Sequence, residues 1–142
     1  MADLHNNVGK YLSVATRHMQ AAMARRMEHL GIGAGQYPYL FSLYHEDGQT
    51  QQHLADRLLV DKSAAVGAIN RLEGLGYVER RTDAADRRHY RIHLTDRGRE
   101  IRPELERIVE EVLAQALDGM DNRERDALLA ALRKVVEHMT AK

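Results

Sequence analysis

The most constraining feature of this sequence is a change in the spacing of its apolar residues at Gly76. Before Gly76, apolar residues recur every three or four positions, which is the period of an amphipathic α-helix. After it, Tyr90, Ile92 and Leu94 alternate with polar neighbours, which predicts a half-buried strand, and residues 77–82 offer it a partner. The sequence therefore predicts a mainly α fold that carries one small β-hairpin.

Six segments show the helical period, and N-capping residues or glycines separate them. We expect helices near residues 4–30, 36–45, 50–59, 61–75, 95–118 and 121–139. Thr50, Asp61 and Thr95 are N-cap candidates, and Asp121 with Glu124 forms a capping-box pattern. Pro103 lies inside the fifth segment, so it either bends that helix or marks where its long straight part begins.

The segments capped by Thr50 and Asp61 are separated by a very short break, which predicts a helix-turn-helix. The two predicted strands follow directly and are joined by a polar tip at residues 83–88. A helix-turn-helix with an appended hairpin is an arrangement that proteins use to place one helix in a DNA groove.

Composition sets the limits of this interpretation. With 142 residues and 44% hydrophobic content, the chain fits one globular domain or a compact subunit of a dimer. The absence of cysteine excludes disulfides, thiol nucleophiles and cysteine-ligated zinc. No apolar run reaches the length of a membrane-spanning helix and the first ten residues lack a signal-peptide pattern, so we expect a cytoplasmic protein without membrane contact.

The charges balance overall, with 21 basic and 21 acidic residues, but they are unevenly distributed. Residues 57–102 contain 11 basic and 7 acidic side chains, and ten of the 11 are arginine. The first 56 residues carry a net charge of −1 and the residues from Pro103 onward carry −3. A basic middle between acidic ends predicts that the middle contacts phosphate.

The helix after Asp61 has one apolar and one polar side. Ser63, Gly67 and Asn70 fall on the polar side, with Lys62 and Arg71 at its margins. Small residues allow close approach to base edges, asparagine can pair with adenine, and arginine can read guanine. The alternative is the ordinary polar face of a helix in water.

The hairpin tip contains Asp86, Arg87 and Arg88. An arginine at the end of such a finger gains from the negative potential of a narrow minor groove. We expect Asp86 to accept a hydrogen bond from Arg88 and to hold its guanidinium in one orientation. The alternative is a solvated turn that is merely rich in charge.

The stretch LLVDKSAAVGAINRLEGLGYVERRTDAADRRHYRIHLTDRGREI resembles the winged helix-turn-helix core of the MarR family of transcriptional regulators, and TQQHLADRL resembles the first helix of that motif. The resemblance implies a winged helix-turn-helix lobe at 35–99, with 1–34 and 100–142 forming N- and C-terminal dimerisation helices of a single domain, 1–142. It also implies that the protein is a ligand-responsive repressor. Such a repressor is a homodimer and binds a near-palindromic operator in double-stranded DNA. The apolar stripes of the terminal helices favour a dimer independently, because they exceed what one small lobe can cover.

The resemblance assigns roles to particular residues of this chain. The recognition-helix positions are Lys62, Ser63, Gly67, Asn70 and Arg71. The wing positions are Asp86, Arg87 and Arg88. The candidate phosphate contacts are Thr50, Gln52 and Arg57, together with Lys62 and Arg87.

Regulators of this family are released from DNA by a bound ligand or by cysteine oxidation, and the second route is closed here because the chain has no cysteine. We therefore expect a small aromatic or other hydrophobic effector in a cleft bordered by aromatic and histidine residues, with plain core packing as the alternative. The candidates are Tyr11, His18, Tyr37, Tyr39 and Tyr44.

Three other classes of function are alternatives. The eight histidines suggest a metal-responsive regulator, but their spacing forms no convincing ligand set, so we expect no metal and no cofactor. The sequence contains no HExxH, GxxxxGK[ST], GxSxG or full dinucleotide motif, so we expect no enzyme. An architectural DNA-binding protein with little sequence preference is the third alternative.

Overall fold

The computed structural model describes residues 3–141, so the expected domain limits at residues 1 and 142 lie outside it. Its helices are α1 (Val8–Met27), the 3-10 helix η1 (Glu28–Leu30), α2 (Tyr37–His45), α3 (Gln51–Leu58), α4 (Lys62–Gly74), α5 (Asp96–Glu100), α6 (Arg102–Ala116) and α7 (Asn122–Thr140). Its strands are β1 (Gln49–Thr50), β2 (Val78–Thr82) and β3 (Tyr90–Leu94). This is the expected mainly α fold with a small β-sheet wing.

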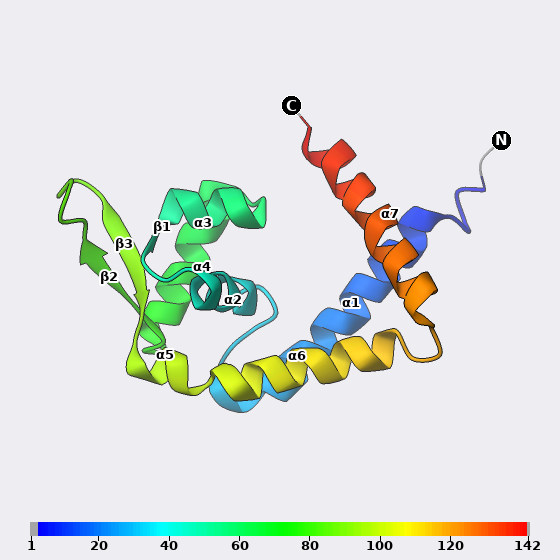
Figure 1. Cartoon of the computed structure of the whole chain (residues 1–142), viewed down its shortest axis with the longest axis horizontal. Coiled ribbons are helices and arrows are strands. Elements are labelled where there is room, and N and C mark those ends of the chain that lie inside the picture. The colour runs from blue at the N-terminus through cyan, green and yellow to red at the C-terminus, as the bar shows by residue number, and fades with distance from the viewer. Residues whose placement is uncertain (1–2, 142) are drawn as a thin grey trace.

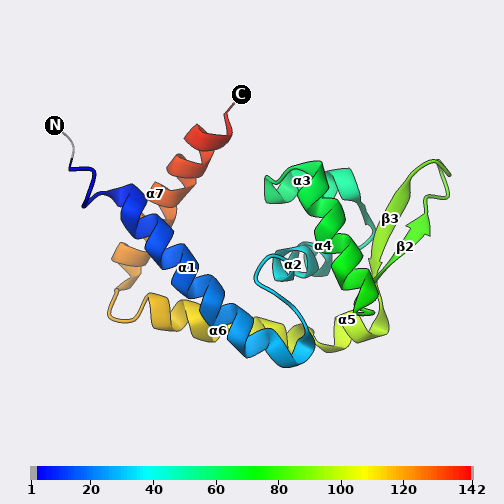
Figure 2. The ribbon, with the colours of Figure 1, turned by 180° about the vertical axis from the view of Figure 1, so that it is seen from behind.

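The molecule has two parts that α6 connects (Figure 1). On one side, α2, α3 and α4 pack together beside the sheet, whose β2–β3 hairpin projects outward. On the other side, α1 lies along α6 and α7 turns back from the far end of α6, as the reverse view also shows (Figure 2). We refer to α2–α5 with the three strands as the winged lobe.

The first helix begins later than the sequence predicts, at Val8 instead of Leu4. Asn7 has an extended backbone and its side chain accepts the backbone N–H of Lys10, so it is the N-cap. The side chain of Leu4 is 84% exposed, because the chain reaches the helix only after this residue. At the other end, Gly31 has a φ of 75°, a left-handed conformation that favours glycine and ends the helical segment.

Pro103 marks the start of a long straight helix, which is the second of the two alternatives that the sequence predicts. The short helix α5 ends at Glu100, and α6 begins at Arg102 with the proline in its first turn, where a missing N–H removes no intrahelical bond. The N-cap predictions at Thr50, Asp61 and Thr95 are confirmed, as is the capping box of Asp121 and Glu124.

The sheet has three strands in the order β1-β3-β2, so the prediction of a two-stranded hairpin was incomplete. The hairpin itself is antiparallel and places Arg80 opposite Ile92 and Val78 opposite Leu94. The added strand is only two residues long and pairs Gln49 with Ile92. Two residues are too short to show an alternating pattern in a sequence.

One hydrophobic core runs from the winged lobe into α1 and α6. In the lobe, its fully buried side chains include Leu40, Leu43, Leu54, Ile69, Leu72 and Ile92. In the connecting helices they include Met23, Met27, Leu105, Ile108 and Val112. The predicted apolar side of α4 is confirmed, since Ala65, Ile69 and Leu72 are all fully buried.

Gly98 is required by a close approach between α5 and the start of the hairpin. A Cβ at this position would lie 2.2 Å from the carbonyl oxygen of Tyr77, which no backbone adjustment of a few tenths of an ångström relieves. The Tyr77 hydroxyl donates to the carbonyl of Leu30 at 2.6 Å, and the Tyr44 hydroxyl donates to the carbonyl of Gly98 at 2.6 Å. The Tyr77 hydroxyl thus joins the winged lobe to η1, and the other two contacts hold α5 against the rest of the lobe.

α7 has no buried residue among those described, although it is amphipathic. Its apolar side chains Leu128, Leu129, Val135, Val136 and Met139 are 37–79% exposed. No helix among residues 3–141 is both long enough and apolar enough to cross a membrane.

Candidate nucleic-acid interface

The N-terminus of α4 is held by Asp61. The Asp61 carboxylate accepts the backbone N–H of Ala64 at 2.7 Å and the hydroxyl of Ser63 at 2.8 Å. Both hydrogen bonds favour the charged carboxylate and lower the pKa of Asp61, with the Ala64 amide contributing most. The preceding turn is tight because Leu59 adopts a left-handed conformation with a φ of 56°. Leu59 thereby ends α3 and begins the turn that leads to α4.

The outward face of α4 is open. Ser63, Gly67 and Asn70 are exposed, as the helical period predicts. A Cβ at Gly67 would meet no atom within 4 Å, so nothing in the described part of the protein covers this position. Lys62 begins the helix and is also exposed. The face that a DNA groove would meet is therefore small, polar and open.

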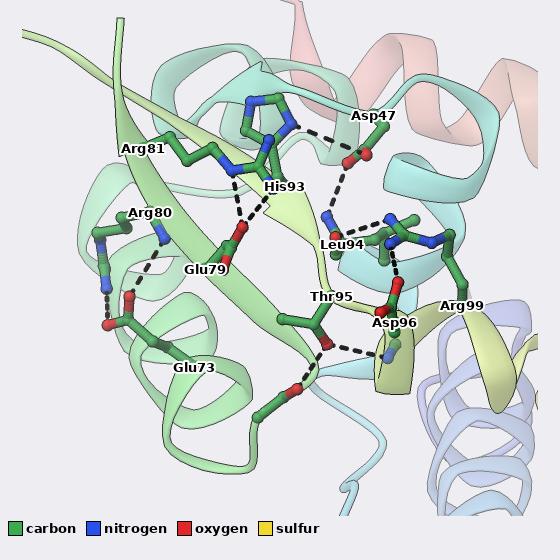
Figure 3. Close-up of polar contacts among 12 residues, drawn as sticks. Asp47, Glu73, Glu79, Arg80, Arg81, His93, Leu94, Thr95, Asp96 and Arg99 are labelled. Atoms are coloured by element: carbon green, nitrogen blue, oxygen red, sulfur yellow. Dashed lines mark hydrogen bonds and ion pairs between the residues drawn. The ribbon is translucent and has the colours of Figure 1, made fainter.

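Arg80, which the sequence did not single out for binding, lies beside α4, and Figure 3 shows its guanidinium against Glu73. Its guanidinium donates to Glu73 at 2.6 Å and to the side-chain oxygen of Asn70 at 2.7 Å. It therefore links β2 to the exposed side of α4. The two partners are seven and ten residues away along the chain, so no local sequence pattern indicated this contact.

Arg71 lies at the other margin of α4. Its guanidinium donates to the carbonyl oxygen of Gly31 at 3.4 Å, which directs it toward the loop that follows η1. Arg71 therefore lies at the margin of the face formed by Ser63, Gly67 and Asn70, where the helical period places it.

The wing tip has the geometry that the sequence predicts. Arg88 donates from Nε to Asp86 at 3.0 Å and from Nη2 to the other carboxylate oxygen at 3.1 Å, while its backbone N–H adds a third bond at 3.1 Å. The hydrogen bonds between the two side chains raise the pKa of Arg88 and lower the pKa of Asp86, because they favour the charged form of each group. The Arg88 side chain nevertheless stays 87% exposed. Its charge is oriented by Asp86 and still accessible to a ligand.

A second pair stabilises the wing behind its tip. Arg91 donates to the carboxylate of Asp83 at 3.1 Å and to the carbonyl of Gly48 at 2.9 Å. Arg91 thus joins both arms of the hairpin to the turn before β1. The backbone N–H of Ala85 is the main cause of the lowered pKa of Asp83, and Arg91 adds to it.

The base of the wing is fixed by polar contacts around α5 (Figure 3). The Thr95 hydroxyl donates to the carbonyl of Gly76 at 2.6 Å and accepts the N–H of Gly98 at 3.1 Å. Asp47 accepts the backbone N–H of Leu94 at 2.9 Å. The angle between the wing and the helix-turn-helix is therefore set by hydrogen bonds at the root of the hairpin.

A cleft of about 500 Å³ lies between the wing and the first turns of α3 and α4. It is lined by Thr50, Gln51, Gln52, Lys62, Asp83, Arg88, His89 and Tyr90. Four of the predicted binding residues, Thr50, Gln52, Lys62 and Arg88, thus meet around one concave surface. Gln51, His89 and Tyr90 were missed by the sequence analysis.

Tyr90 was assigned to the buried side of its strand, and this was wrong. Its side chain is 53% exposed, whereas Ile92 and Leu94 of the same alternating set are buried. The strand extends beyond the core at its tip end, so the alternation continues where there is no core to cover the side chain. The result is an exposed aromatic ring beside the wing cleft.

Three predicted phosphate contacts have protein partners. Gln52 donates to Asp56 at 2.8 Å on the exposed side of α3. Arg57 donates to Glu46 at 2.7 Å and borders a cleft other than the one beside the wing. Thr50 uses its hydroxyl oxygen to cap α3 and accepts the N–H of His53 at 3.1 Å.

The cleft that Arg57 borders has a volume of about 470 Å³ and lies between α2, α3 and α6. It is lined by Tyr37, Pro38, Phe41, Ser42, Arg57, Leu58 and Val109. The rings of Tyr37 and Phe41 meet edge to face, with centroids 5.9 Å apart. Burial raises the pKa of Tyr37 above its ordinary value.

The five candidate effector residues are not brought together. Of these, Tyr37 lines the cleft just described, while His18 borders a groove between α1 and α6. Tyr11 is 59% exposed near α7, Tyr39 is buried in the core, and Tyr44 bonds to Gly98. Among residues 3–141 there is no group of three or more histidine, aspartate or glutamate side chains placed to hold a metal ion.

Comparison with known proteins gives a consistent match. A sequence model of the MarR family matches residues 30–89. Over 130 residues the chain is 27% identical to the HTH-type transcriptional regulator YybA of Bacillus subtilis, an uncharacterised protein, covering 92% of this chain and 87% of that one. The crystal structure of a MarR transcriptional regulator from Methanosarcina mazei Go1 is 37% identical with a TM-score of 0.83, covering 92% of this chain and 94% of that one. A MarR family regulator from Listeria monocytogenes, crystallised with a 26mer DNA, is 26% identical with a TM-score of 0.87, covering 95% of this chain and 90% of that one.

Proposed function

Because this chain belongs to the MarR family of transcriptional regulators, we propose that it binds double-stranded DNA sequence-specifically as a homodimer and represses transcription until a small effector releases it. One observation carries the proposal. Lys62, the first residue of α4, and the oriented Arg88 of the wing line the same cleft. A duplex seated there would place α4 in its major groove and Arg88 in the adjacent minor groove.

The binding residues divide by chemistry into two groups. Ser63, Gly67 and Asn70 form the surface that meets base edges. Gly67 has no side chain to donate a hydrogen bond, but it lets the helix backbone approach the bases closely. Lys62, Arg87 and Arg88 supply positive charge at the edges of that surface. Because Arg57 is paired with Glu46 away from this cleft, we assign it no phosphate contact.

The homodimer is supported by the exposed apolar face of α7. An apolar groove of about 580 Å³ between α7 and the first turns of α1 lies next to this face, and it is lined by Val8, Tyr11, Leu12 and Ala15 of α1 and by Leu128, Ala131, Leu132 and Val135 of α7. A second copy of the chain would cover both surfaces symmetrically. We therefore assign residues 35–99 to DNA binding and residues 1–34 and 100–142 to dimerisation.

We place the effector in the cleft between α2, α3 and α6. This cleft lies where the winged lobe meets α6, so a ligand inside it would change the angle between the DNA-binding and dimerisation parts. Its aromatic edges and the adjacent guanidinium of Arg57 suit a small aromatic compound.

The test compares two DNA molecules of equal length: the region upstream of the gene for this protein and a scrambled version of it. Binding of the purified protein to each is measured over a series of salt concentrations. The proposal predicts that the two affinities differ at every salt concentration, because base contacts add to the charge term. Equal affinities throughout would favour an architectural protein with little sequence preference.

A further inference from the structure

Arg80 occupies an unusual position for an arginine in a basic region, since its side chain is only 19% exposed. It lies opposite Ile92 in the β2–β3 register, on the side of the sheet that carries the buried Ile92 side chain. From there its guanidinium reaches α4, with one nitrogen 2.6 Å from Glu73 and the other 2.7 Å from the side-chain oxygen of Asn70. The backbone N–H of Arg80 also donates to Glu73, at 3.3 Å.

This contact determines which way the amide of Asn70 faces. An asparagine amide has one oxygen that accepts hydrogen bonds and one nitrogen that donates two. A guanidinium has donors only, so the Asn70 oxygen must turn toward Arg80 and the nitrogen must turn away from it. Glu73 holds the guanidinium from the other side, which keeps it from following Asn70 if the amide rotates.

The direction of the amide decides which base it can read. Pairing with adenine through two hydrogen bonds requires the asparagine oxygen to accept from N6 while the nitrogen donates to N7. With its oxygen directed to Arg80, Asn70 presents two donors to the groove. Guanine is the base whose major-groove edge carries two adjacent acceptors, N7 and O6, whereas in an A·T pair the N6 donor of adenine stands between the acceptors.

We infer that Arg80 is a positioning residue that turns Asn70 into a donor, so that the recognition helix reads guanine at the base pair that Asn70 meets. The inference rests on the proposed function and specifies its sequence preference. It differs from the expectation, drawn from the residue type alone, that asparagine can pair with adenine.

The test begins by selecting binding sites from a random library of double-stranded DNA with the full-length wild-type protein. Relative affinities for the four base pairs are then measured at each selected position, for the wild type and for Asn70→Ala. The position where Asn70→Ala abolishes the preference is the one that Asn70 reads. We expect the wild type to prefer guanine there by roughly fivefold to a hundredfold.

Three variants test the role of Arg80. Arg80→Met keeps an unbranched stem but frees the Asn70 oxygen, so the preference should move from guanine to adenine at that position alone. Arg81→Met is the matched control. Arg81 is the next residue of β2 and pairs with Glu79, not with Asn70, and its substitution removes the same positive charge. It should weaken binding to all sequences without changing any base preference. Asn70→Asp keeps an acceptor for Arg80 but has no donor, so the guanine preference should disappear.

Thermal unfolding of each variant shows whether it is folded. If Arg80→Met does not fold, Asn70→Asp still tests the inference, because that variant keeps Arg80. A wild-type preference for adenine at the Asn70 position, or a guanine preference that survives Asn70→Asp or a folded Arg80→Met, would overturn the inference. If Asn70→Ala changes no position of a clearly selected site, the inference fails while the proposed function stands. If no sequence is selected at all, the proposed function itself fails.

Discussion

Arg88 and Asp86 form a bidentate ion pair at the tip of the wing, with N–O distances of 3.0 and 3.1 Å. The Arg88 side chain nevertheless remains 87% exposed. A carboxylate beside a DNA-binding arginine repels the DNA phosphates, so charge alone predicts that removing the carboxylate strengthens binding. The pair instead orients the guanidinium before it meets the minor groove.

We therefore predict that Asp86→Asn weakens DNA binding although it makes the protein more positive. Arg88→Ala should weaken binding to all sequences and reduce the slope of log affinity against log salt by about 1 for each phosphate that the variant no longer neutralises. Both are measured by fluorescence anisotropy on labelled duplexes over a salt series. Tighter binding by Asp86→Asn would show that Asp86 only repels DNA.

A second prediction concerns two glycines in different environments. Gly98→Ala should destabilise the fold by roughly 1–3 kcal/mol or more, because the added Cβ would lie 2.2 Å from the Tyr77 carbonyl oxygen. Gly67→Ala should stabilise it by about 1 kcal/mol, because this glycine lies inside α4 and its Cβ meets no atom within 4 Å. Urea unfolding of both variants measures the difference. Equal effects of the two substitutions would contradict the close packing of α5 against Tyr77.

The third prediction tests the dimer surface. Leu129→Glu combined with Val136→Glu should produce monomers, because burying unpaired carboxylates between subunits costs about 3–5 kcal/mol. The helical content should persist, since both side chains are about half exposed in the single chain. Ala130 lies on the side of α7 that is opposite the apolar face of this helix. The variant Ala130→Glu is therefore the control, and it should remain dimeric. Sedimentation equilibrium at micromolar concentration distinguishes these states, and a monomeric wild type would refute the dimer.

A fourth prediction concerns the cleft between α2, α3 and α6. Small phenolic compounds are screened for release of DNA from the wild type in a gel-shift assay. Val109→Trp should fill part of the cleft of about 470 Å³ and abolish release while leaving DNA binding intact. Ala114→Trp, an exposed position of α6 outside the lining of that cleft, should still be released. If Val109→Trp is released as readily as the wild type, the effector binds elsewhere.

The sequence predicted those features of the molecule that depend on neighbouring residues. The caps at Thr50, Asp61 and Thr95 each involve residues three positions apart, and the Asp86–Arg88 pair spans two, so both are visible in a linear pattern. The buried side of α4 follows from the helical period alone.

The features that the sequence did not predict depend on how distant segments meet. Strand β1 exists because Gln49 lies beside Ile92, and Asn70 faces Arg80 only because the hairpin folds back on α4. The aromatic residues Tyr11, Tyr39 and Tyr44 were grouped by type, but the packing of their helices places them in separate surroundings. Residue type indicated what each side chain can do, and only the fold determined which partner it has.

The central claim is that two winged lobes of one dimer read a single DNA site. Hydroxyl-radical footprinting on the selected sequence tests this claim most directly. We expect two protected tracts whose centres lie about one helical turn, roughly 10 base pairs, or a small multiple of it apart. They should appear together at a stoichiometry of two chains per duplex. A single tract, or protection that spreads along the DNA as protein is added, would contradict the claim.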